Sequence, residues 1–142
     1  FGSFDGGYDG ELFDGVLPRI FTETGNHHTD EFPPDEVIAN AIFEVDTAGW
    51  AEPWEKLSGR IMDGFTDIAK ESEAKGAKNI VIVSHGMTIG TFVKLAHPEL
   101  PRPHGLDNGS VTHLSFEDGK FTIGKVGDMS YREIGSEKLA KK

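Results

Sequence analysis

The sequence predicts an α/β fold, and three observations carry this prediction. The continuous β-branched run Ile80–Val83 is typical of a strand buried on both faces. Apolar residues at helical spacing occupy the stretch from Trp54 to Ile68 ahead of that run. Further along, Asp118-Gly119 between two extended runs marks a hairpin. Helical and extended patterns therefore alternate along the chain, as they do in α/β domains.

Two helices are expected ahead of the strand. The first begins near Pro34, because proline is favoured at helix starts, and it ends near Gly49. Its apolar stripe consists of Val37, Ile38, Ala41, Ile42 and Val45. The second runs from about Pro53 to a glycine stop at Gly76. Its stripe consists of Trp54, Leu57, Ile61, Phe65 and Ile68, which places these side chains on one face.

A third helix is expected from about Thr88 to Ala96, because Pro98 forbids its continuation. Its inward residues are Ile89, Phe92, Val93 and Ala96. The hairpin then places Val111, Leu114 and Phe116 in one strand and Phe121, Ile123 and Lys125 in the other. The polar tail Gly135–Lys142 is expected to fray.

His85 is the most informative residue for function. It follows the predicted strand directly, in Ser84-His85-Gly86, and a helix starts at once. Ligands of open α/β sheets bind at such strand ends, and a helix start favours anions, phosphate above all. His85 with the backbone of Gly86 and Met87 is therefore a candidate phosphate site. A histidine that only caps a turn is the alternative interpretation of this local motif.

Several segments resemble the histidine phosphatase superfamily, the phosphoglycerate mutase-like proteins. Asn79–Val111 is similar to its second-histidine region, and Phe1–Gly7 to its Phe-Gly-x-Trp/Phe-Glu-Gly segment. Leu106–Val111 is similar to its Asn-containing loop, and Phe116–Val126 to its closing hairpin. The segments occur in the family's order and cover most of the chain. The resemblance implies a three-layer α/β/α phosphoglycerate mutase-like fold in a single domain, 1–142, that lacks its early strands.

The resemblance also implies a phosphatase or mutase that acts through a phosphohistidine. In that family the nucleophile lies in an Arg-His-Gly motif, which this sequence does not contain. A second phosphate-binding arginine is not found either, and the family's proton-donating acid precedes the segment that starts here at Phe1. His85 would therefore be the second pocket histidine, an electrostatic stabiliser, with Gly86 and Met87 binding phosphate. The resemblance implies no cofactor and no metal, and the chain by itself is expected to be inactive.

Two other functions compete with this one. A non-catalytic relative could keep the anion cradle without a nucleophile, and the lack of Arg-His-Gly favours it for the chain as given. An α/β-hydrolase also uses His-Gly after a strand, but it needs a Gly-x-Ser-x-Gly elbow, which this sequence lacks. The hydrolase ranks last.

Composition limits the partners. The net charge of −10 argues against nonspecific nucleic-acid binding and leaves a phosphorylated small molecule as the expected substrate. No apolar run is long enough to span a membrane. The 142 residues suffice for one domain with a buried core, and the lack of cysteine is compatible with a cytoplasmic protein.

The remaining polar candidates carry weaker signals. His27 and His28 lie beside acidic residues, but such a pair is more often a polar loop than a metal site. Asn108 is a turn residue first and a substrate contact second. His97 and His104 are expected to cap turns, and His113 to face solvent or one polar neighbour.

Without an Arg-His-Gly strand beside it, Ile80–Val83 would have unpaired edges that invite further pairing. Burying them unpaired would cost about 1–3 kcal/mol per group. We therefore expect one of three arrangements. The family's missing N-terminal segment is bound as a separate peptide, a second copy of the chain pairs with the edges, or the strand around Val111 moves against Val81.

Overall fold

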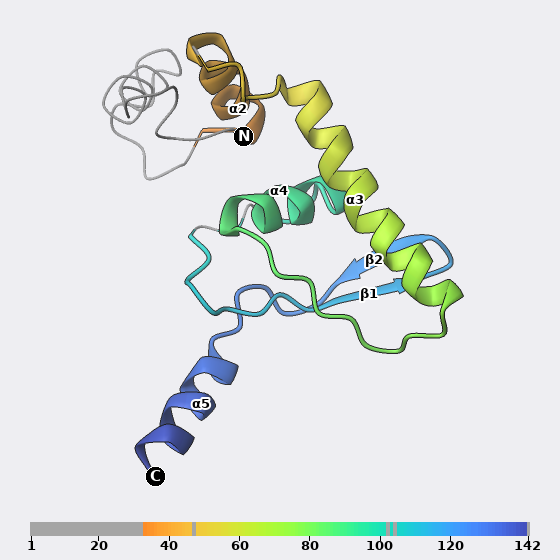
Figure 1. Cartoon of the computed structure of the whole chain (residues 1–142), viewed down its shortest axis with the longest axis vertical. Helices are drawn as coiled ribbons and strands as arrows, with labels where there is room; N and C mark the ends of the chain where they lie inside the picture. Colours follow the sequence, from red (N-terminus) through yellow and green to blue (C-terminus); the bar gives the residue numbers. More distant parts are fainter. Residues whose placement is uncertain (1–32, 47, 102, 104, 142) are drawn as a thin grey trace. The chain divides into compact units, whose positions relative to one another are not determined.

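The computed structural model describes residues 33–46, 48–101, 103 and 105–141 (Figure 1). The elements follow the order α2 (Asp35–Val45), α3 (Trp54–Ala74), α4 (Gly86–Ala96), β1 (Leu114–Glu117), β2 (Lys120–Ile123) and α5 (Ser130–Ala140). The chain forms two compact units, Phe1–Arg60 and Ile61–Lys142. None of the helices within the described ranges combines the length and the hydropathy that a membrane crossing requires.

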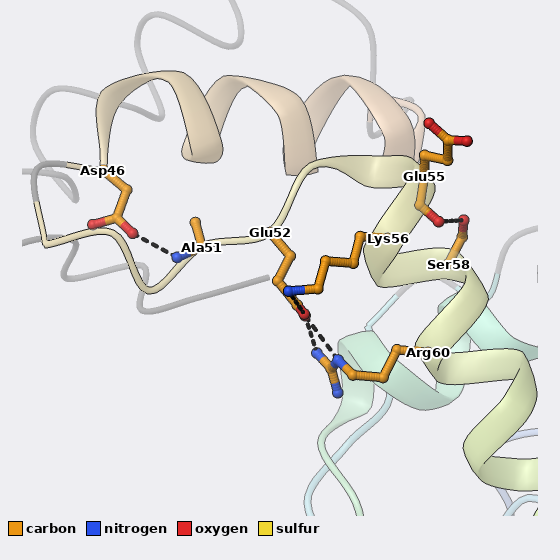
Figure 2. Close-up of polar contacts among 7 residues, drawn as sticks. All are labelled: Asp46, Ala51, Glu52, Glu55, Lys56, Ser58 and Arg60. Atoms are coloured by element: carbon orange, nitrogen blue, oxygen red, sulfur yellow. Dashed lines mark hydrogen bonds and ion pairs between the residues drawn. The ribbon is translucent and has the colours of Figure 1, made fainter.

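The first predicted helix is confirmed as α2. Pro34 precedes it, and its carbonyl accepts the N–H of Ile38 at 3.1 Å. Ile38 and Ile42 are fully buried. The helix gives way to a turn at Asp46, whose carboxylate accepts the backbone N–H of Ala51 at 2.5 Å (Figure 2). The same carboxylate accepts the N–H groups of Ala48 at 3.0 Å and of Trp50 at 2.5 Å. The Ala51 amide above all holds the pKa of the Asp46 carboxyl below its usual range.

The second predicted helix is confirmed as α3. Its first amide, at Trp54, donates to the Asn40 side chain at 2.8 Å. Near its start, Glu52 binds both Lys56 and Arg60 (Figure 2). The helix ends at Ala74, and Gly76 caps it with φ +71° while the Ala77 N–H donates to the Ser72 carbonyl, as in a Schellman cap.

The prediction is wrong for one residue of the apolar stripe of α3. Leu57, Ile61 and Phe65 are buried, but Ile68 is 39% exposed and Ala69 is buried instead. The reason is the helical period of 3.6 residues. Four-residue steps from Leu57 and Ile61 continue through Phe65 to Ala69, which leaves Ile68 at the margin of the buried face.

The strand predicted at Ile80–Val83 is also wrong. This segment belongs to no strand, and its backbone makes no hydrogen bond within the described part of the chain. Val81 and Val83 are 90% and 92% exposed. A β-strand exists through pairing with a neighbour, and none of the described segments pairs with this one. The expected movement of Val111 against Val81 is not seen, since Val111 pairs with Asp128.

The third predicted helix is confirmed as α4, which begins two residues earlier than expected. Phe92 and Val93 are fully buried, as predicted. The Phe92 ring stacks on that of Phe65 in α3, with 4.0 Å between ring centroids. It packs edge-to-face with the ring of Phe121 in β2, with 4.9 Å between centroids. Phe116 of β1 extends this aromatic row, with its ring 4.7 Å from that of Phe121. The row joins α3, α4 and the hairpin within the second unit.

The predicted hairpin is confirmed. Strands β1 and β2 pair antiparallel, with Leu114 opposite Ile123 and Glu117 opposite Lys120. Asp118 and Gly119 have φ values of +50° and +75°, as a two-residue type I′ turn requires. Lys125, expected to continue the alternation, lies beyond β2, and its carbonyl accepts the His113 N–H.

The frayed tail predicted from Gly135 is wrong, because α5 occupies Ser130–Ala140. No residue of α5 is buried, so no apolar period marked this helix in the sequence. Asp128 starts it instead, accepting the Ser130 N–H on its carboxylate at 3.0 Å.

Candidate functional site

His85 lies at the N-cap of α4, directly before the first helical residue. Its backbone is extended, with φ −81° and ψ 148°, and its carbonyl accepts the Ile89 N–H at 3.0 Å. The residue is exposed, and its ring makes no hydrogen bond or ion pair with the described residues. The predicted place before a helix is confirmed, although the segment ahead of it is not a strand.

The amides that follow His85 are suited to an anion. The first N–H groups of a helix have no intrahelical acceptor, and no side chain caps those of α4. The first turn carries no acidic residue, so the positive end of the helix dipole is not offset there. Gly86 is exposed and Met87 is half-buried. These two amides and the His85 ring therefore share the start of one helix.

Leu106 packs behind this helix start, and sequence reasoning did not find it. A Cβ atom on Gly86 would lie 3.4 Å from the Leu106 carbonyl oxygen and 3.5 Å from its Cβ. A Cβ atom on Gly127 would lie 3.1 Å from Leu106 Cδ2. Leu106 thus joins the start of α4 to the turn that leads into α5. A lone leucine among prolines and glycines has no periodicity from which this role could have been predicted.

Asn108 occupies a turn, as predicted. The Ser110 N–H donates to the Asp107 carbonyl at 3.0 Å, and Gly109 has φ +82°. Asn108 is exposed, and its carbonyl accepts a long hydrogen bond of 3.4 Å from Arg132 Nη1 of α5. Leu106, two residues earlier, brings this loop toward Gly86. The contact between Asn108 and a substrate stays a prediction.

His97 caps the opposite end of α4, as predicted. Its N–H donates to the Val93 carbonyl. Its ring nitrogens lie 2.8 Å from Glu99 Oε1 and 2.9 Å from the Phe121 carbonyl oxygen. The Phe121 carbonyl first, and Glu99 second, raise the pKa of the His97 ring.

His113 has one polar neighbour, as predicted. Its Nε2 lies 3.7 Å from Asp128 Oδ2, and its ring is half exposed. The other oxygen of Asp128 accepts from Lys125 Nζ at 2.8 Å and from the Ser130 N–H. The Lys125 ammonium, with the Ser130 amide, holds the pKa of the Asp128 carboxyl far below its usual range. This cluster fastens the start of α5.

The other histidines that drew attention, His27, His28 and His104, lie outside the described residues. Within the ranges that the structure describes, no group of three or more His, Cys, Asp or Glu side chains is placed to hold a metal ion.

Comparison with known proteins identifies the family. Residues 24–129 match the family model of the histidine phosphatase superfamily, branch 1. The structure is similar to the crystal structure of phosphoglycerate mutase from Bacillus anthracis str. Sterne, with a TM-score of 0.76 and 29% sequence identity. The match covers 91% of this chain and spans 57% of the length of that mutase. No curated protein sequence matches.

These matches bear on the prediction of fold class. The chain, with its helices and hairpin, has part of a phosphoglycerate mutase-like α/β fold, and that fold class is confirmed. The matched residues include His85, Gly86, Met87 and Asn108 and extend over most of the chain. The chain belongs to the histidine phosphatase superfamily, branch 1.

Proposed function

We propose that His85 and the first amides of α4 bind the phosphoryl group of a phosphorylated small molecule. The single observation that carries this proposal is the exposed His85 at a helix start whose N–H groups no side chain caps. Charge-assisted hydrogen bonds to phosphoryl oxygens are stronger than those between neutral groups. Aimed at charge that develops during transfer, such donors lower the reaction barrier.

In the reaction we propose, the histidine of an Arg-His-Gly motif attacks phosphorus, and His85 is not the nucleophile. An N–P bond forms as the bond to the leaving oxygen breaks, and water or an acceptor hydroxyl then takes the phosphoryl group. His85 stabilises the phosphoryl oxygens in both steps. The sequence contains no Arg-His-Gly from which that nucleophile would come. We therefore propose that the 142-residue chain binds the anion and does not turn it over alone.

The proposed partners follow from the same residues. The substrate is a phosphorylated small molecule, and we place its use in the cytoplasm. The aliphatic Ile80–Val83 segment, which pairs with none of the described residues, is suited to another β-strand, supplied by an Arg-His-Gly segment or by a second copy of the chain. A non-catalytic anion-binding protein is the second candidate, favoured by the lack of the nucleophile motif.

The binding step is tested by NMR titration with inorganic phosphate, sulfate or vanadate. We expect the amides of Gly86 and Met87 and the ring of His85 to shift first. His85→Ala should weaken phosphate binding by about tenfold, as expected for a charge-assisted contact. His113→Ala is the matched control and should leave it unchanged. Largest shifts at another site, around His27 and His28 for example, would refute the assignment.

Activity is tested with p-nitrophenyl phosphate. We expect no turnover from this chain, and turnover once a peptide carrying Arg-His-Gly restores the nucleophile. If the chain binds phosphate but shows no turnover either alone or with the Arg-His-Gly peptide, the non-catalytic candidate is supported. Turnover by the chain alone that His85→Ala abolishes would reveal an unrecognised nucleophile and contradict the proposed division of roles.

A further inference from the structure

We propose that His97 is a protonated cross-link between the end of α4 and the hairpin, and that loss of its proton loosens the helix that carries His85. The last step rests on the proposed function, whereas the cross-link itself does not. His97 is a positioning residue here, because it acts through α4.

The geometry of the ring requires two protons. Nδ1 lies 2.8 Å from the Glu99 carboxylate, and Nε2 lies 2.9 Å from the Phe121 carbonyl oxygen. Both partners are acceptors, and a neutral imidazole has one N–H. The imidazolium form satisfies both contacts, while the neutral form leaves two acceptors facing a single donor.

The surroundings of the ring favour the same form. His97 is the C-cap of α4, where the negative end of the helix dipole stabilises a cation. The charged groups around it are Glu99, which the ring contacts, and Lys94, which binds the carbonyl groups of Pro98 and Leu100 in the same loop. Strand β2 contributes the Phe121 carbonyl to the ring and no charged side chain. The ring is 27% exposed, so a change of pH reaches it directly.

The cross-link matters because it is one of the contacts that attach the hairpin to α4. A two-stranded hairpin is marginally stable alone in water. Phe121 attaches it to α4 twice, by its ring against Phe92 at 4.9 Å and by its carbonyl on His97. Deprotonation of His97 weakens the contact with the Phe121 carbonyl and leaves the contact between the Phe92 and Phe121 rings.

The sign of the pH dependence follows from the raised pKa of His97. The cross-link stabilises the fold fully below the ordinary histidine value of about 6.5. This stabilisation is lost as the pH rises through the higher pKa of the folded state. Since α4 is one helix from Gly86 to Ala96, loosening its end disturbs the amides at its start.

Ring ¹⁵N NMR on the full chain tests the cross-link. An unperturbed histidine is about one-quarter protonated at pH 7. We expect a larger protonated fraction of His97 there, with N–H protons on both nitrogens in that fraction. Glu99→Gln should lower its titration midpoint while the Phe121 contact persists. Titration of wild-type His97 at or below the ordinary value would overturn the proposal.

Two variants then test the consequence for the site. We expect His97→Gln to reduce the Phe92–Phe121 ring contacts at pH 6, and to weaken sulfate binding at His85 by about threefold. Neither effect should remain at a pH well above the titration midpoint measured for wild-type His97, where its ring has lost its proton. His113→Gln is the control and should change neither readout. Equal effects of His97→Gln at both pH values would show a merely structural role and overturn the switch.

Sulfate serves as the probe because its charge is constant over this range. If sulfate fails to shift His85, Gly86 and Met87 at either pH, the proposed function fails. The ring protonation and the Phe92–Phe121 contacts then still decide the cross-link on their own.

Discussion

Gly127 combines a left-handed backbone with a close neighbour. Its φ is +67°, and an added Cβ atom would approach Leu106 Cδ2 to 3.1 Å. We expect Gly127→Ala to lower the free energy of unfolding by about 1–2 kcal/mol, mainly through the left-handed conformation, since the leucine side chain can shift. Urea unfolding followed by circular dichroism measures this change.

Gly64→Ala is the matched control. Gly64 lies within α3, with nothing within 4 Å of an added Cβ. Alanine there should stabilise the chain by about 0.5–1 kcal/mol, because it favours the helix. If Gly127→Ala left the free energy of unfolding unchanged while Gly64→Ala raised it, then neither the left-handed turn at Gly127 nor its approach to Leu106 would restrict the residue at this position.

At this scale the sequence located some residues of the site and not others. Ser-His-Gly before a helical pattern indicated His85 and the two amides, because a chain entering a helix leaves its first N–H groups free. Leu106 could not be predicted, since its role depends on a contact with Gly86 that lies far from it in sequence.

Among the elements, α5 depends on polar contacts for its attachment. Asp128 accepts from the Ser130 amide and Lys125, and none of the residues of α5 is buried. We expect Asp128→Asn to lower stability at pH 7. Because the pKa of Asp128 is depressed in the folded state, its contribution is present above the ordinary aspartate value of about 3.9 and is lost as the pH falls through the folded value.

Thermal unfolding of wild type and Asp128→Asn across pH 2–7 measures this. The difference in Tm should be largest near neutral pH and shrink in acid. Asp118→Asn is a suitable control, since Asp118 lies in the hairpin turn, where asparagine also tolerates a positive φ. A difference in Tm that stays constant with pH would mean that the charge of Asp128 does not hold α5.

The elements also show where sequence patterns suffice. Helices α2, α3 and α4 make their own backbone hydrogen bonds, so an apolar stripe and end signals predicted them. The hairpin was predicted because Asp118-Gly119 fixes a local pairing. Ile80–Val83 has the composition of a strand, but pairing needs a partner that the segment itself cannot supply. Helix α5 lacks a buried face and so gave no periodic signal.

For the whole molecule, the exposed Ile80–Val83 segment predicts association. In the absence of another chain, we expect copies to pair through this segment, because the Val81 and Val83 side chains are exposed and the backbone makes no hydrogen bond with the described residues. Val81→Lys with Val83→Lys should raise the dissociation constant at least about tenfold, since burial of each valine contributes about 1.5–3 kcal/mol.

Light scattering over a concentration series measures this association. Leu139→Lys on α5 is the control, because it removes another exposed apolar residue that lies outside the segment. A wild-type chain that is monomeric at every concentration would contradict the expectation. So would an equal effect of Leu139→Lys.

The aromatic row of the second unit also has a consequence in time. Phe65–Phe92 and Phe116–Phe121 join elements that follow one another along the chain, and Phe92–Phe121 skips only β1, so each contact closes a loop within the second unit. Short loops close at low entropic cost, and proteins rich in local contacts fold quickly. The row should therefore assemble in an early, unimolecular phase. Pairing of Ile80–Val83 with another strand should follow as a slower phase whose rate depends on concentration.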